Sequence, residues 1–151
     1  PKVAQIPSIE DLEAYLKGKK LGPDALNELD WDTFRDTRQG KKSTVKGFLL
    51  NQRYLAGVGN LYADEICYQC RIHPASRVDH LPEKKWKEVF EKMKEILQTA
   101  VDRDAYYRHY PDDWFWKWRK EGAEAPDGSI IEKTEVAGRT TYFAGKWQQR
   151  F

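Results

Sequence analysis

The chain has 151 residues, 40% of them hydrophobic, which is enough to bury the core of one ordinary domain or of two small ones. A third of the residues are charged, but the formal net charge is only +2, so the total charge selects no class of partner. Two cysteines do not make a disulfide framework, and the sequence has no signal peptide or long apolar run. We therefore expect an intracellular, reducing compartment and no membrane partner.

Short helices are predicted in the first part of the chain. Residues 8–16 are expected to form a helix capped by Ser8, and a glycine and a proline then break the helical pattern. Residues 25–29 and residues 31–38 are each expected to form a further short helical piece.

Basic residues are concentrated in the stretch that follows. It holds six basic residues and one acid, Asp36, which gives a local charge of +5. Such segregation is typical of a protein that binds a polyanion, although a solvated lysine face has the same sequence pattern. The six basic residues are Arg35, Arg38, Lys41, Lys42, Lys46 and Arg53.

A glycine-punctuated turn between two helices is the centre of the sequence. A helix capped by Ser43 or Thr44 runs to about residue 52, and a second helix runs over residues 61–71. Gly57 and Gly59 allow positive φ and a close approach of a ligand, and Asn60 suits the helix cap. Free amides at a helix start make an anion site, most often for phosphate. The same pattern also fits a plain connection between packed helices.

The rest of the chain contains one long helix and a hairpin. Apolar residues repeat every three or four positions over residues 86–101, which predicts an amphipathic helix of about five turns. Aromatic residues are frequent from Tyr106 to Trp118. Residues 130–136 and 140–144 are expected to form a β-hairpin, with Arg139 projecting from its tip. A guanidinium at that place can reach a phosphate.

Other candidate sites are explained better by structural roles. Cys67 and Cys70 have metal-knuckle spacing, but both lie inside a predicted helix without a second ligand pair, so we expect buried core thiols and no metal. His109 has no nucleophile spaced with it, so no catalytic residue is predicted. The tryptophans at 114, 116 and 118 can stack on nucleobases, but core packing is favoured.

Five motifs resemble, in order, the C-terminal half of the formamidopyrimidine-DNA glycosylase and endonuclease VIII family. The resemblance implies a mainly α fold, with a helix-two-turn-helix domain over residues 1–105 and an aromatic bridge and β-hairpin finger over residues 106–151. The motifs are residues 21–24 (LGPD), 46–52 (KGFLLNQ), 56–65 (AGVGNLYADE), 72–74 (IHP) and 138–143 (GRTTYF).

By this resemblance, Lys46, Asn60 and Arg139 correspond to the phosphate-contacting residues of the family. Together with the turn at Gly59, they form the predicted phosphate-binding set. Such contacts hold the DNA backbone around a damaged base and supply geometry, not base chemistry.

The finger departs from the family's usual zinc finger. The four ligand positions are occupied by Glu124, Asp127, Ala144 and Trp147, so the tail resembles the family's zincless finger. We expect aromatic packing by Tyr142, Phe143 and Trp147 against the bridge to replace the metal. No metal and no other cofactor is predicted.

The catalytic part of the family differs more. The family attacks the sugar with an N-terminal proline amine, helped by an adjacent glutamate, in a β-sandwich domain. Pro1 is followed by Lys2, and no β-rich segment precedes the helices, so we expect the chain to lack that domain and not to excise a base alone.

The predicted function is the DNA-gripping region of a base-excision-repair DNA glycosylase and AP lyase, intracellular and monomeric, bound to duplex DNA with a damaged base or abasic site. A stand-alone module that binds RNA or DNA is the alternative. Activity through Pro1 itself is a further possibility.

Overall fold

The structure is a computed structural model that describes residues 21–151, so Pro1 and the helix expected over residues 8–16 lie outside the described residues. Four α-helices, three short 3-10 helices and one hairpin follow one another in this part of the chain. They are α2 (Trp31–Thr37), α3 (Val45–Leu50), α4 (Asn60–Gln69), η1 (Val78–His80), α5 (Glu83–Asp102), η2 (Tyr107–His109), η3 (Phe115–Trp118), β1 (Ile131–Val136) and β2 (Arg139–Ala144).

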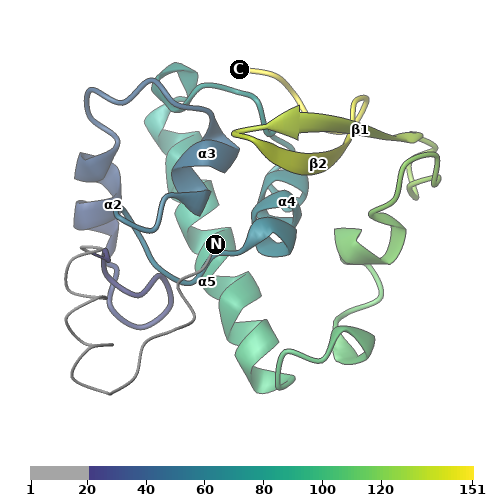
Figure 1. The fold of residues 1–151 in the computed structure, drawn as a ribbon, viewed down its shortest axis with the longest axis horizontal. Helices are drawn as coiled ribbons and strands as arrows, with labels where there is room; N and C mark the ends of the chain where they lie inside the picture. Colours follow the sequence, from purple (N-terminus) through teal and green to yellow (C-terminus); the bar gives the residue numbers. More distant parts are fainter. Residues whose placement is uncertain (1–20) are drawn as a thin grey trace, which may run out of the picture.

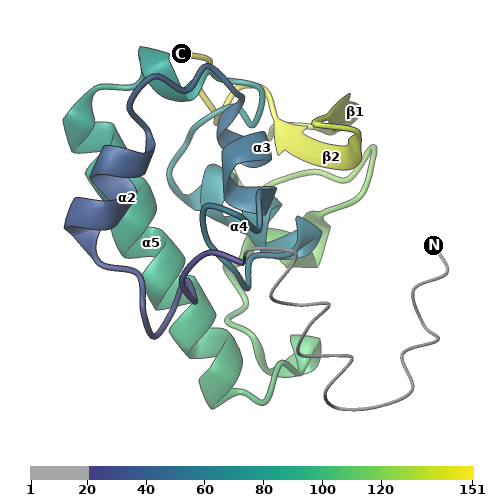
Figure 2. The same cartoon turned by 60° about the vertical axis from the view of Figure 1, so that its left-hand side comes forward.

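The helices form one body and the hairpin lies against its side. In Figure 1, α5 runs behind α3 and α4, and Figure 2 shows α2 packed along α5. In both views the hairpin lies beside α3 and α4, and β2 contacts α4. The mainly α fold with a terminal β-hairpin is therefore confirmed.

The short helices begin where polar side chains cap them. The Asp30 carboxylate accepts a hydrogen bond from the Thr33 amide at the start of α2 (2.8 Å). The Thr44 hydroxyl accepts one from the Gly47 amide at the start of α3 (3.0 Å). The prediction of a helix over residues 25–29 is wrong, because residues 25–28 form turns. The Asp24 carboxylate accepts from the amides of Leu26 and Asn27, as a helix cap does. The next two amides both bond the Asp24 carbonyl, however, so the helical pattern does not continue.

An aromatic cluster organises the helical core. Phe34 of α2 stacks on Trp86 of α5 with ring centroids 4.4 Å apart, and Phe48 of α3 meets Trp86 edge-on at 5.0 Å. All three side chains are almost completely buried. The long helix presents this ring and a regular apolar stripe to the core, which confirms the predicted periodicity.

The hairpin is closed by a tight turn. Ala137 (φ 55°) and Gly138 (φ 74°) both have left-handed backbone conformations, and Val136 pairs with Arg139. Two consecutive positive φ values give the turn type whose twist matches a two-residue hairpin. Arg139 is therefore the first residue of β2, next to the turn, and its side chain is exposed.

The finger is held by a second, smaller apolar cluster. Tyr68 of α4 stacks on Phe115 of the bridge (4.6 Å) and on Trp147 after the hairpin (5.9 Å). Phe143 instead packs against His73, which corrects the expectation that it meets the bridge. The cluster's buried members are Tyr68, Phe115, Ala125, Ile131 and Ala144.

Two of the four positions that align with the family's zinc ligands have other roles in this chain. The Asp127 carboxylate accepts hydrogen bonds from the Ser129 amide (3.1 Å) and hydroxyl (2.7 Å), while Ala144 is buried. Among residues 21–151, no three histidine, cysteine or acidic side chains are grouped to hold a metal. No helix in the same range is long and apolar enough to cross a bilayer.

Because aromatic stacking holds the finger, Trp147→Ala is expected to lower the melting temperature of the chain, whereas a chelator such as EDTA is expected to leave it unchanged. Differential scanning calorimetry with and without EDTA measures both effects. A melting temperature that falls on chelation, with the Trp147→Ala chain as stable as wild type, would contradict the packing account.

Candidate nucleic-acid interface

The turn between α3 and α4 contains one glycine with a positive φ angle. Gly57 has φ +111°, which only glycine adopts readily. Gly59 has φ −93° and ψ −180°, so the prediction of positive φ at this position is wrong. Gly59 is also the cap of α4, one residue earlier than predicted, and Asn60 is the first helical residue.

Hydrogen bonds from both sides fix the turn. The Gln52 side chain spans it, accepting from the Gly57 amide (3.2 Å) and donating to the Val58 carbonyl (3.4 Å). The segment before α2 packs on the turn, with the Ala25 amide bonded to the Ala56 carbonyl (2.8 Å). A Cβ at Gly22 would lie 2.6 Å from the Tyr54 backbone, which shows how close this packing is.

The start of α4 carries free donors. The Ala63 amide makes the first bond of this helix, to the Gly59 carbonyl (2.9 Å), so the amides of Asn60 and Leu61 precede the first helical partner. The Gly59 amide donates to no atom within residues 21–151. The positive end of the helix dipole adds to these donors and favours an anion here.

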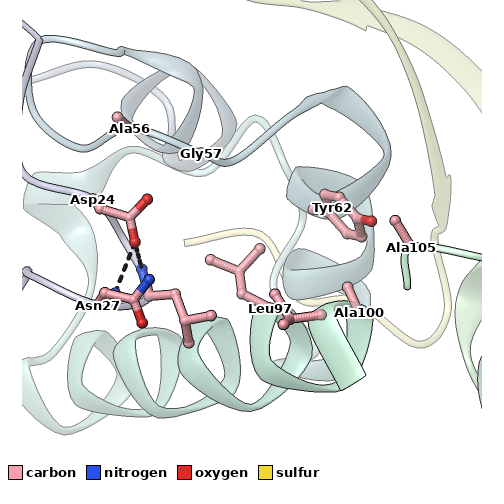
Figure 3. Close-up of a pocket in the computed structure, with 10 residues that line it drawn as sticks. Asp24, Asn27, Ala56, Gly57, Tyr62, Leu97, Ala100 and Ala105 are labelled. Atoms are coloured by element: carbon pink, nitrogen blue, oxygen red, sulfur yellow. Dashed lines mark hydrogen bonds between the residues drawn. The ribbon is translucent and has the colours of Figure 1, made fainter. Parts of the chain in front are cut away.

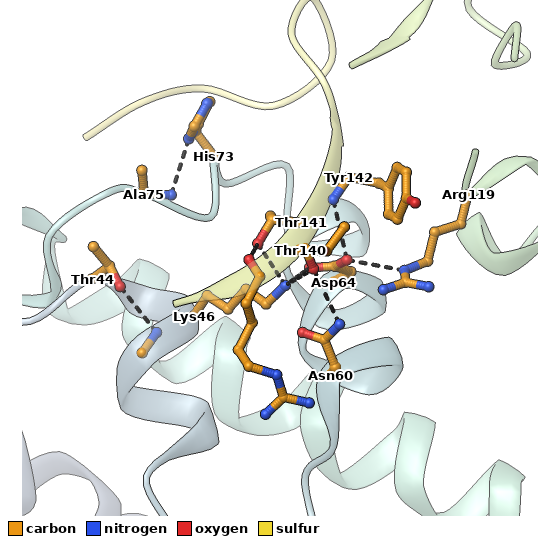
Figure 4. A network of polar contacts seen from close by, with 12 residues as sticks. Thr44, Lys46, Asn60, Asp64, His73, Ala75, Arg119, Thr140, Thr141 and Tyr142 are labelled. Carbon is orange, nitrogen blue, oxygen red and sulfur yellow. Dashed lines mark hydrogen bonds and ion pairs between the residues drawn. The ribbon is translucent and has the colours of Figure 1, made fainter. Parts of the chain in front are cut away.

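The structure brings Asn60 next to the residue that follows Arg139, a proximity that the sequence analysis did not predict. The Asn60 Nδ2 donates to the Thr140 carbonyl (3.1 Å), which belongs to the residue directly after Arg139 (Figure 4). The Arg139 side chain is exposed and has no ion-pair partner among the described residues. The helix start and the hairpin tip therefore form one edge.

Lys46 lies beneath this edge, not on it. Its side chain has no exposed surface, and its Nζ bonds Asp64 Oδ1 (2.8 Å), Thr141 Oγ1 (2.7 Å) and the Thr140 carbonyl (3.1 Å). Burial lowers the pKa of Lys46, and the attraction of Asp64 opposes that shift. A direct phosphate contact by Lys46 stays a prediction, because here the ammonium faces only protein oxygens.

Asp64 joins three parts of the chain. Its Oδ2 accepts from Arg119 Nε of the bridge (2.9 Å) and from the Tyr142 amide of β2 (3.2 Å), while Oδ1 pairs with Lys46 of α3. Asp64 itself is fully buried and Arg119 is 17% exposed at its side chain. The sequence reasoning missed these roles, although two adjacent acids inside an otherwise buried helix were a signal for them.

Glu65, the second of these acids, anchors the bridge. Its carboxylate accepts from the amides of Phe115 (2.8 Å) and Trp116 (3.0 Å) and from Gln69 Nε2 (2.8 Å). Burial raises the pKa of Glu65 to about 6, and these three hydrogen bonds only partly oppose that rise. The carboxylate therefore ties the start of η3 to α4.

The predicted basic patch is narrower than the sequence implied. Arg35 pairs with Asp32 and Asp36 at the surface, and Arg38 donates to the backbone carbonyls at the start of η1 and directly after it. Together with the buried Lys46, three of the six cations therefore have partners within the protein. The three that stay without an acidic partner among the described residues are Lys41, which lies over the Tyr54 ring, Lys42 and Arg53.

The remaining sequence candidates have structural roles. Cys67 and Cys70 are free buried thiols, as predicted, and burial raises both pKa values, that of Cys70 to about 12. Trp114 packs against the main core and Trp118 against the second cluster, which confirms core packing over base stacking for these two. His109 is exposed and stacks on Tyr106.

A cavity of about 230 Å³ lies between the turn and the end of α5 (Figure 3). Its walls are mostly apolar and include Gly57, Tyr62, Leu97 and Val101. The charged group at its edge is the Asp24 carboxylate, which already binds the amides of Leu26 and Asn27. Because none of the described residues that line it is a cation, we do not assign this cavity to the edge formed by the start of α4 and the hairpin tip.

Known proteins resemble the chain over most of its length. Residues 21–110 match the family model described as the formamidopyrimidine-DNA glycosylase H2TH domain. A formamidopyrimidine-DNA glycosylase of Arabidopsis thaliana is 36% identical over 135 residues, which cover 87% of this chain and 35% of that protein. One from Listeria innocua is 42% identical, over 87% of this chain and 52% of its own length.

Solved structures give the same result. The Lactococcus lactis Fpg in complex with DNA containing an abasic site superposes with a TM-score of 0.78 at 28% identity, over 95% of this chain and 57% of that one. MutM bound to DNA with carbocyclic 8-oxo-G gives 0.76 at 29% identity. The chain spans about a third to a little over half of the length of the relatives named here.

The buried Glu65 predicts a pH-dependent stability. Because its folded pKa of about 6 lies above its ordinary value of 4.5, the folded state binds the proton more tightly. Its favourable contribution is complete below pH 4.5 and is lost as pH rises through 6, a change of about 2 kcal/mol. Urea unfolding at several pH values should show this change in wild type and not in Glu65→Gln. A difference between the two chains that is constant with pH would contradict it.

Proposed function

The chain belongs to the formamidopyrimidine-DNA glycosylase family, and we propose that it forms the DNA-gripping part of a base-excision-repair DNA glycosylase and AP lyase. The observation that carries this proposal is the single edge on which the free amides of α4, Asn60 and Arg139 lie together. The solved relatives named above are complexes with DNA that contains an abasic site or an altered base, which supports a duplex of that kind as the partner.

Each member of the edge would contact the phosphate backbone in its own way. The Gly59 and Asn60 amides and the helix dipole would receive a phosphate at the start of α4. The Asn60 side chain would orient this phosphate. The exposed Arg139 guanidinium would bind a neighbouring phosphate with two parallel hydrogen bonds. Such contacts position a duplex without reading its sequence.

Gly59 supports a close approach of the ligand to the backbone. Its φ and ψ are open to any residue, and an added Cβ would meet no atom within 4 Å. Neither backbone conformation nor packing within residues 21–151 therefore requires glycine at this place. A phosphate lying directly on the backbone does require it.

Three unpaired cations would extend the grip along the duplex. Lys41, Lys42 and Arg53 lie before and within the turn that leads to Asn60, and none has an acidic partner among residues 21–151. Positive charge of this kind adds affinity by releasing counterions from DNA. We therefore propose double-stranded DNA as the partner. We also propose that the protein binds it as a monomer, in the intracellular compartment that contains the DNA.

We assign the removal of the damaged base to a part of the protein other than residues 21–151. By family resemblance, the imine-forming proline belongs to a β-sandwich domain, and we propose that residues 21–151 supply grip and geometry. The helical part and the finger would then act as one unit that holds the DNA backbone on either side of the damaged base while the base is flipped out.

Charge and hydrogen bonding at the edge can be separated experimentally. Arg139→Ala should weaken duplex binding on the order of tenfold and reduce the slope of log affinity against log salt by about 0.9, because one ionic contact is lost. Asn60→Ala should weaken binding without changing the slope, because no charge is removed. Fluorescence anisotropy with an abasic-site duplex at several salt concentrations measures both quantities.

Lys84→Ala is the matched control for charge. Like Arg139, Lys84 is exposed and has no ion pair among the described residues, but it lies on α5 and not on the edge formed by α4 and the hairpin. Its loss should therefore leave the slope unchanged. Wild-type binding that is absent, or that does not depend on salt, would refute the proposed function.

The two glycines of the turn should respond in opposite ways to alanine. Gly59→Ala should keep the fold to within about 1 kcal/mol and lose DNA affinity, because its methyl group would occupy the place of the phosphate. Gly57→Ala should lose roughly 1–3 kcal/mol of stability, because alanine is strained at φ +111°. Thermal unfolding and anisotropy distinguish the two. Full duplex affinity in Gly59→Ala would argue against a phosphate on this backbone.

A further inference from the structure

We infer that Lys46 is a positioning residue, whose buried ammonium holds the start of β2 against α4 and so sets Arg139 beside Asn60. It does not contact a phosphate. This inference rests on the proposed function and assigns Lys46 a role different from that expected from the family resemblance.

The Lys46 ammonium interacts with three oxygen atoms inside the protein. Its Nζ donates hydrogen bonds to the Thr141 hydroxyl (2.7 Å) and the Thr140 carbonyl (3.1 Å), and it forms an ion pair with the Asp64 carboxylate (2.8 Å). The side chain has no exposed surface. A phosphate could replace these acceptors only if the ammonium left its site.

Two of these acceptors, on Thr140 and Thr141, belong to the residues that directly follow Arg139. The Thr141 hydroxyl, which accepts from Lys46, donates in turn to the Arg139 carbonyl (2.9 Å). The Thr140 carbonyl accepts from both Lys46 Nζ and Asn60 Nδ2 (Figure 4). One buried ammonium therefore fixes the two peptide groups that follow Arg139, and it shares one of them with Asn60.

The charges around Asp64 show which substitution tests this role cleanly. Asp64 lies between Lys46 and Arg119. Removing Asp64 would leave Lys46 buried without a countercharge, and the finger could then fail to fold. Removing the charge of Lys46 leaves Asp64 paired with Arg119, so Lys46→Met keeps a balanced pair and a similar buried volume.

Fixing the hairpin tip is expected to raise affinity without adding a contact. A guanidinium on a tip that moves freely must be ordered when it binds, and that entropy is subtracted from the binding free energy. The bonds from Lys46 impose this order before DNA arrives. The contribution of Arg139 to affinity should therefore depend on Lys46.

A double-mutant cycle measures that dependence in the 151-residue chain. Wild type, Lys46→Met, Arg139→Ala and the double variant are titrated with an abasic-site duplex at several salt concentrations. Each single variant is expected to bind several-fold to tenfold more weakly, and the double variant no more weakly than Arg139→Ala. In the Arg139→Ala background, Lys46→Met should leave the salt slope unchanged.

A direct phosphate contact by Lys46 would give a different result. The two losses of DNA affinity would then multiply in the double variant, and the slope of log affinity against log salt would decrease by a further amount of about 0.9. That result would overturn the inference.

Thr141→Val is an independent test that keeps the lysine charge. Valine fits the buried position but cannot accept from Lys46 or donate to the Arg139 carbonyl. The positioning role predicts that Arg139→Ala has a smaller effect in this background than in wild type. A direct contact by Lys46 predicts an undiminished effect, which would also overturn the inference.

Glu65→Gln is the matched structural control. Glu65 is the neighbouring buried acid on α4, but its bonds go to the bridge and not to β2. It should lower stability and leave the effect of Arg139→Ala at its wild-type size. If wild type does not bind DNA in a salt-dependent way, the proposed function fails. If Arg139→Ala weakens binding equally in the wild-type, Lys46→Met and Thr141→Val backgrounds, only the positioning role fails.

Discussion

The architecture depends on one buried carboxylate. Asp64 of α4 binds Lys46 of α3, Arg119 of the bridge and the β2 backbone, so it joins segments that lie far apart in the sequence. Burying such charges is costly, and removing one partner of a buried pair typically costs roughly 3–5 kcal/mol. The two fully buried charges of the cluster also have hydrogen-bonding partners, because Lys46 donates to Thr140 and Thr141 and Asp64 accepts from the Tyr142 amide. The geometric specificity of the cluster fixes the finger in one orientation on the helices.

The neighbouring residue on α4 performs the second attachment. Glu65 holds the start of η3, and Tyr68 one turn later stacks on both the bridge and Trp147. Three successive parts of α4 thus have three roles. Its first residues carry free amides, Asp64 and Glu65 in its middle are buried acids, and Tyr68 near its end packs against the finger. This arrangement explains how a small finger, in which the described residues group no set of metal ligands, keeps its place beside the start of α4.

Patterns that are local in sequence predicted the fold well, and long-range contacts were the limit. Periodicity and caps predicted α3, α4, α5 and the hairpin. The family motifs singled out Asn60 and Arg139, but not that they lie close together. The burial of Lys46 could not be predicted, because its acceptors at residues 140 and 141 are more than ninety positions away. The basic stretch indicated a cation available to a polyanion, but the Lys46 ammonium is bound by β2 and α4.

The most direct test of the central claim is a crystal structure of the chain bound to a duplex with an abasic site. The account predicts phosphates on the Gly59 and Asn60 amides and on the Arg139 guanidinium. It also predicts that Lys46 Nζ stays on Asp64 and Thr141 beneath them. A phosphate bound by Lys46, or a duplex lying on a face without Asn60 and Arg139, would contradict it.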